Sequence, residues 1–152
     1  MKKLEFKVNI SAPVDKAYDF MLGISNKFTY EQWTSIFNPT STYEGSWGKG
    51  SKILFFGIDD NGEKGGMVSK IIDNIPNQFV SIQHCGLLKG NEEITEGPEI
   101  EKWANSFENY TFTNDNGSTT VTVNLDVIEE FLDYMNTHYP KALEKLKELC
   151  EK

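Results

Sequence analysis

The chain has 152 residues, of which 12% are aromatic, and its 23 acidic side chains outnumber its 15 basic ones. This length supports one domain with a substantial core, which we expect to cover residues 1–152. The formal net charge of −8 argues against nonspecific binding to nucleic acid or to an anionic membrane.

The same composition contains no targeting or disulfide signal. No apolar run approaches the roughly 20 residues that span a bilayer, and the first residues interleave charged with apolar side chains, unlike a signal peptide. The two cysteines, Cys85 and Cys150, do not resemble a disulfide framework. We therefore expect no membrane insertion, a cytoplasmic location and reduced thiols.

The N-terminal part of the chain combines one strand with two short helices. Apolar and polar side chains alternate over residues 3–10, which predicts a strand with one buried face. Pro13 then suits the first turn of a helix that ends at Gly23. A second short helix is expected from Asn26 to about Ile36, before Asn38-Pro39.

The middle of the chain is a succession of strands and turns. Asp59-Asp60-Asn61-Gly62 is its strongest hairpin signal, because Asn-Gly readily adopts the positive φ angles of a type I′ turn. The expected strands cover residues 42–47, 52–57, 66–72 and 78–88.

A glutamate-rich segment, Lys89–Glu101, follows these strands. It has no hydrophobic periodicity, so we interpret it as a long exposed loop, with an acidic contact site or a lid as the alternative. Two further strands are expected at residues 102–113 and 118–127, the second of which alternates valine and leucine with polar residues.

The C-terminal segment from Glu129 to Lys152 is predicted to be one long amphipathic helix. Its apolar residues recur every three or four positions, and lysines gather in its second half. Pro140 cannot donate the hydrogen bond that the Asn136 carbonyl would normally accept. Because the apolar stripe keeps its phase across the proline, we expect one helix that bends there instead of two helices.

Together these elements predict an α+β fold. Consecutive hairpin-like connections imply an antiparallel sheet. A curved sheet of about seven strands can wrap one face around the C-terminal helix, while the two short helices after the first strand close one end.

Several short motifs are shared with a known group of proteins. They are Ile10-Ser11-Ala12-Pro13 with Tyr18, Gln32-Trp33-Thr34, Phe37-Asn38-Pro39, Glu44-Gly45-Ser46-Trp47, Gly50-Ser51-Lys52-Ile53, Gly66-Met67-Val68, Ile75-Pro76, Glu108-Asn109-Tyr110-Thr111-Phe112 and Leu143-Glu144-Lys145-Leu146. In this the chain resembles the SRPBCC (START and birch-pollen-allergen-like) superfamily. Within it, the chain is similar to the AHSA type, the single-domain relatives of the activator of a heat-shock chaperone's ATPase. The resemblance implies a helix-grip fold with a cavity between the sheet and the long helix.

Aromatic and helical residues supply the candidates for lining that cavity. Core packing is the alternative for each of them. The candidates are Trp33, Phe37, Trp47, Phe55, Trp103 and Tyr110, with Phe131, Met135 and Tyr139 from the helical stripe.

Two polar residues are candidates for contacting a ligand inside the cavity. His84 has the same strand parity as Val80 and Ile82, and Glu108 the same as Tyr110, so both side chains are expected to face inward. His84 would then be a polar contact or a satisfied buried histidine. Glu108 would be a buried carboxylate that anchors a ligand or transfers protons, or else a rim residue paired with lysine.

We favour noncatalytic binding of a small hydrophobic molecule, a lipid or an aromatic metabolite, as the function. The sequence has no nucleophile elbow, phosphate-binding glycine loop, dinucleotide fingerprint or metal-ligand spacing, so we expect no catalytic residues, cofactor or metal. One alternative is a protein-interaction module with a chaperone partner and a role in the stress response. Another is a cyclase-, hydratase- or hydrolase-type enzyme that uses His84 and Glu108. The chain is expected to be a monomer or a homodimer.

Overall fold

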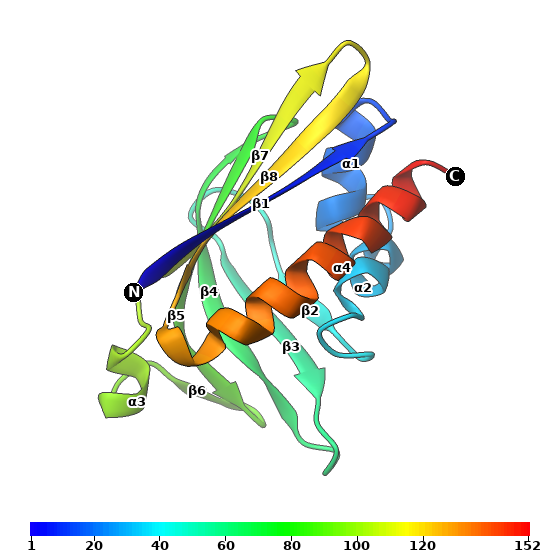
Figure 1. The fold of residues 1–152 in the computed structure, drawn as a ribbon. Coiled ribbons are helices and arrows are strands. Elements are labelled where there is room, and N and C mark those ends of the chain that lie inside the picture. Colours follow the sequence, from blue (N-terminus) through cyan, green and yellow to red (C-terminus); the bar gives the residue numbers. More distant parts are fainter.

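The computed structural model describes residues 1–152 as a curved antiparallel sheet that holds a long helix against one face (Figure 1). This is the predicted α+β helix-grip fold, with eight strands in place of about seven. The strands are β1 Lys2–Ile10, β2 Thr42–Gly45, β3 Lys52–Ile58, β4 Lys64–Ile75, β5 Phe79–Lys89, β6 Glu92–Ile94, β7 Ser106–Asp115 and β8 Ser118–Val127. The helices are α1 Val14–Leu22, α2 Lys27–Thr34, α3 Pro98–Glu101 and α4 Leu132–Cys150.

The strands follow the order β1-β8-β7-β5-β4-β3-β2, and β6 pairs with β5. The pairing puts apolar side chains opposite one another, as in Leu4 with Leu125 and Phe6 with Val123. Since side chains alternate between faces, these pairs lie on the helix side while Lys3 and Asp126 lie on the other side.

The pairing of β4 with β5 contains two irregularities, with an extra residue on β5 at Cys85 and another on β4 at Ile72. The register shifts between Val68 and Ser69 and again between Ile71 and Asp73. Bulges of this kind bend a strand and increase its twist. They therefore help the sheet to curve around α4, and the bulge at Cys85 brings Ser69 opposite His84.

The predicted C-terminal helix is confirmed as one continuous element. A short 3-10 turn over Glu129–Phe131 leads into α4, which passes through Pro140 without interruption. The helix runs diagonally across the sheet (Figure 1) and buries Leu143, Leu146 and Cys150. Neither α4 nor any shorter helix combines the length and the apolar composition needed to cross a membrane.

Helices α1 and α2 lie beside the C-terminal half of α4 (Figure 1). Gly23 ends α1 with a φ of 71°, a left-handed conformation that costs glycine little. Asn26 caps α2 by accepting a hydrogen bond from the Phe28 amide at 3.0 Å. The Trp33 indole of α2 donates to the Met21 carbonyl of α1 at 2.9 Å, so the two helices hold each other in position.

The prediction of a long loop over Lys89–Glu101 was wrong. The segment forms β6 and the short helix α3, and β7 begins at Ser106 instead of Lys102. The cause is a change of partner along one edge of β5. Its residues 79–84 pair with β7 and its residues 87–89 pair with β6, so the short strand completes hydrogen bonds that β7 does not reach.

Candidate functional site

A cluster of polar side chains is buried between the sheet and α4. Glu108 on β7 and His84 on β5 lie diagonally across neighbouring strands, and His84 Nε2 is 3.0 Å from Glu108 Oε1. On the other side, Ser69 is the direct β4 partner of His84, and its Oγ is 2.7 Å from His84 Nδ1. The cluster therefore links three adjacent strands.

The hydrogen bonds fix how protons are arranged around His84. A carboxylate only accepts, so His84 Nε2 carries a proton and donates it to Glu108. The Ser69 hydroxyl donates to Nδ1 when the imidazole is neutral and accepts from it when the ring is protonated. Ser69 thus holds the ring in place in either state.

Two phenols complete the shell of Glu108. The Tyr110 hydroxyl donates to Glu108 Oε2 at 3.2 Å, and the hydroxyl of Tyr139 from α4 donates to the same oxygen. Burial alone would raise the pKa of Glu108, but the hydrogen bond and charge of His84 and the two phenol bonds outweigh it and lower that pKa. Glu108 is therefore ionised at neutral pH.

The pKa values of three neighbouring tyrosines shift in the opposite direction, upward. Burial, together with the negative charge of Glu108, raises the pKa of Tyr30, Tyr110 and Tyr139 well above its usual value. These three hydroxyls stay protonated, so Tyr110 and Tyr139 remain donors to the carboxylate.

Two hollows adjoin this cluster. The first, which we call the aromatic chamber, has a volume of about 370 Å³ and lies between α2, α4 and the sheet. Seven of its thirteen wall residues are aromatic, and nine are hydrophobic. They are Tyr30, Trp33, Phe37, Phe55, Tyr110, Tyr134 and Tyr139, joined by Thr34, Ser41, Gly66, Met67, Glu108 and Met135.

The second hollow, which we call the wide chamber, has a volume of about 580 Å³ and extends towards the N-terminal end of α4. Phe131 and Tyr134 are 48% and 39% exposed, which places apolar rings at its mouth. Its wall consists of Met67, His84, Leu87, Trp103, Ser106, Glu108, Leu125, Asp126, Val127, Ile128, Phe131, Tyr134 and Met135. The two chambers share Met67, Glu108, Tyr134 and Met135, so the buried carboxylate faces both.

All but one of the predicted site residues lie on these walls. The aromatic chamber includes Trp33, Phe37, Phe55, Tyr110 and Tyr139, the wide chamber includes His84, Trp103 and Phe131, and Glu108 and Met135 belong to both. Trp47 is the exception. It is buried against Tyr43 and Phe55, with ring centroids 5.4 and 5.5 Å away, and it lines neither chamber. The alternative of core packing describes its position.

The sequence interpretation missed further residues of the site, among them Tyr30, Met67 and Tyr134 on the walls and Ser69 beside His84. Tyr30 lies three residues before Trp33 and Tyr134 lies three residues after Phe131, so the helical spacing from predicted wall residues was available as a signal. Met67 and Ser69 were not accessible in this way. Met67 pairs with Leu87 and Ser69 with His84 across a bulge at Cys85 of β5, a register that the sequence does not reveal.

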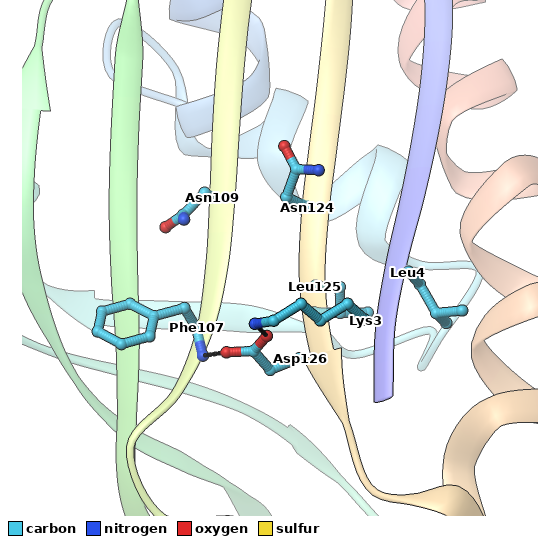
Figure 2. Close-up of a pocket in the computed structure, with 7 residues that line it drawn as sticks. All are labelled: Lys3, Leu4, Phe107, Asn109, Asn124, Leu125 and Asp126. Atoms are coloured by element: carbon cyan, nitrogen blue, oxygen red, sulfur yellow. Dashed lines mark hydrogen bonds and ion pairs between the residues drawn. The ribbon is translucent and has the colours of Figure 1, made fainter. Parts of the chain in front are cut away.

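A smaller hollow of about 170 Å³ lies on the opposite face of the sheet, over β1, β8 and β7 (Figure 2). Its charged groups are already paired. Lys3 Nζ is 2.7 Å from Asp126 Oδ1, and Asp126 Oδ2 accepts from the Phe107 amide at 3.0 Å. We therefore place the candidate site in the two chambers on the helix side.

Comparison with known proteins defines the fold. No protein-family model and no curated protein matches the sequence. Among solved structures, the Aha1 dimer from Colwellia psychrerythraea matches with a TM-score of 0.71 and 22% identity over 99% of this chain and 97% of that one. The chain has the same fold as this Aha1 protein.

Other structures with this fold share still less sequence with the chain. A protein from Mesorhizobium loti matches with a TM-score of 0.71 and 16% identity, covering 97% of this chain and 96% of its own. CalU16 from Micromonospora echinospora matches with a TM-score of 0.65 and 14% identity, covering 97% and 73%. At these identities the likeness concerns the backbone arrangement, and function has to be argued from the site.

Proposed function

We propose that the chain binds a small, mainly apolar molecule, such as a lipid or an aromatic metabolite, without transforming it chemically. The observation that carries this proposal is the pair of adjoining chambers, each with nine hydrophobic residues among thirteen, around one buried carboxylate. Ligand pockets typically measure about 300–1,000 Å³ and combine apolar walls with a few polar groups. Both chambers fall within that range.

The electrostatics of the cluster favour binding over proton transfer. A general base works best when its pKa lies near the working pH. Glu108 is instead held ionised by three donors that lower its pKa, so it is a weak base at neutral pH. It is better suited to hold a fixed charge beside a ligand than to accept a proton from one.

A screen of thermal unfolding with lipids, sterols and aromatic metabolites tests the proposal. A bound ligand raises the free energy of unfolding by about 2.7 kcal/mol at a hundred times its Kd. The same screen is run on Met135→Trp, which fills space shared by both chambers, and on Thr137→Trp, which adds the same ring on the exposed side of α4.

We expect stabilisation of the unmodified chain and of Thr137→Trp, and little or none of Met135→Trp. Stabilisation that persists unchanged in Met135→Trp would show that the ligand binds elsewhere. The absence of any stabilising compound, together with no copurified mass in native mass spectrometry, would refute the binding function.

A second candidate is a protein-interaction module with a chaperone partner, which the fold likeness to Aha1 supports. The proposed contact consists of exposed glutamates of β6, of α3 and of the connection between them, namely Glu92, Glu96 and Glu99. A pull-down with the immobilised chain tests this candidate, and reversal of these three charges should release any captured chaperone. Because the similar Aha1 structure is a dimer, sedimentation of the chain alone should accompany the pull-down.

A further inference from the structure

The walls of both chambers contain no lysine and no arginine. Their acidic residues are Glu108 and Asp126, but the Asp126 carboxylate lies on the opposite face of the sheet, where it is paired with Lys3 at 2.7 Å. Glu108 has neutral phenols on one oxygen and His84 on the other. Apart from the imidazole of His84, which is cationic only when protonated, no side chain on these walls could balance the charge of Glu108, and an uncompensated buried charge is costly.

The donors around Glu108 are also committed. The hydroxyls of Tyr110 and Tyr139 both donate to Oε2, and His84 Nε2 donates to Oε1. What the cluster offers to a ligand is its remaining acceptor capacity, namely the second lone pair of Oε1 and the lone pairs of the phenol oxygens. A ligand head group that donates hydrogen bonds fits this site, whereas a carboxylate or phosphate would face repulsion without a donor to offset it.

The aromatic rings of the aromatic chamber are a second feature that favours a cationic ligand over an anionic one. Its rings stand close together at varied angles, with centroids 6.3 Å apart for Trp33 and Tyr139, 6.4 Å for Trp33 and Tyr110, and 5.2 Å for Phe37 and Tyr139. The faces of aromatic rings attract cations, and several rings around one space form the cages that bind ammonium groups. In this protein the aromatic chamber also contains the Glu108 carboxylate in its wall.

We propose that the ligand is an apolar amine whose ammonium group enters the aromatic chamber, with Glu108 as its counter-ion, and whose apolar body occupies the wide chamber. This inference rests on the proposed function and narrows it to a ligand class. It separates amines from apolar acids such as fatty acids, which the same volume would admit. The net charge of −8 also favours the approach of a cation.

Three probes of similar shape test the inference on the full chain by calorimetric titration. Naphthylmethylamine is cationic, ethylnaphthalene is neutral and naphthoate is anionic, and all carry the substituent at the same ring position. The amine should bind at least about tenfold more tightly than naphthoate, and also more tightly than ethylnaphthalene, because a desolvated cation–π contact alone contributes about one factor of ten.

Two variants locate the effect. Glu108→Gln should lower the affinity for the amine at least about tenfold, because a hydrogen bond to a charged group is lost, and should leave that for ethylnaphthalene nearly unchanged. Glu92→Gln makes the same charge change on the exposed strand β6 and should leave all three affinities unchanged. If Glu108→Gln does not fold, the order of the three probes on the unmodified chain still decides the question.

The alternatives give different results. Naphthoate or ethylnaphthalene binding as tightly as the amine would overturn the amine assignment and leave the binding function intact. An equal loss of amine affinity in both variants would overturn the role of Glu108. No binding of any probe, together with a negative ligand screen, would overturn the binding function and this inference with it.

Discussion

Removal of the Tyr139 hydroxyl should destabilise the protein measurably, although it changes one buried atom. Tyr139 is 2% exposed, and its ring stacks on Phe6 with centroids 5.2 Å apart. Tyr139→Phe keeps this packing and removes one of three hydrogen bonds to Glu108. A hydrogen bond to a charged group contributes about 1.5–3 kcal/mol. Because Tyr110 still donates to the same oxygen, we expect a loss near the lower end, about 1.5 kcal/mol in the free energy of unfolding.

The stability lost in Tyr139→Phe should become smaller as the pH falls. The pKa of Glu108 is lower in the folded protein than its usual value, so its contribution to stability is fully present above the unfolded pKa and disappears as the pH falls through the folded pKa. Tyr139→Phe raises that folded pKa by removing a donor. The difference in stability between the two proteins should therefore be largest at neutral pH and should narrow in acid.

Urea unfolding at pH 7 and at several acidic pH values measures both effects. Tyr134→Phe is the matched control, because Tyr134 is 39% exposed and its hydroxyl makes only a long bond of 3.4 Å to the Phe37 carbonyl. It should change the stability by less than about 0.5 kcal/mol. The account of the Glu108 cluster would be refuted if Tyr139→Phe lowered the free energy of unfolding by less than about 0.5 kcal/mol. It would also be refuted if the loss of stability stayed the same at acidic pH.

Three further predictions concern the core, the sheet and the thiols. Leu143→Ala should cost about 2–5 kcal/mol by urea unfolding, because Leu143 is almost fully buried under α4. Gly66→Ala should cost about 1–3 kcal/mol, since its Cβ would lie 1.9 Å from the Phe55 carbonyl oxygen, whereas Gly65→Ala has 3.9 Å of room and should cost little. In the folded protein a thiol reagent at pH 8 should modify Cys85 and spare Cys150, because burial raises the pKa of Cys150 to about 12. Equal labelling of both thiols, or equal stability of the two glycine variants, would contradict the corresponding prediction.

The main elements of the fold were predictable because their sequence patterns match their burial. Strict alternation over β1 and β8 and the three-to-four spacing in α4 each describe one buried face, and the structure buries those faces. The segment Lys89–Glu101 was not predictable in this way. Its strand and helix are short and exposed, and β6 exists because β5 extends beyond the start of β7, which is a property of the assembled sheet.

The site was predictable to the extent that it depends on strand parity. Parity placed His84 and Glu108 on the helix side, but their 3.0 Å contact depends on the register between β5 and β7. The partnership of His84 with Ser69 depends further on a bulge at Cys85 in β5. Trp47 was predicted to line the cavity but lies in the adjoining core. The sequence could not separate these positions, because aromatic residues in both have the same local sequence pattern.

The methionine methyl groups provide the most direct test of the central claim that the two chambers bind a ligand. The chain has four methionines. Met67 and Met135 lie on the walls of both chambers, Met21 is fully buried in the core, and Met1 is 60% exposed. In a titration of the methyl-labelled protein with naphthylmethylamine, followed by NMR, we predict that the signals of Met67 and Met135 shift and saturate together while those of Met1 and Met21 stay in place. A saturating shift confined to Met1 or Met21, or no saturable shift of Met67 and Met135 with any of the three probes, would contradict the claim.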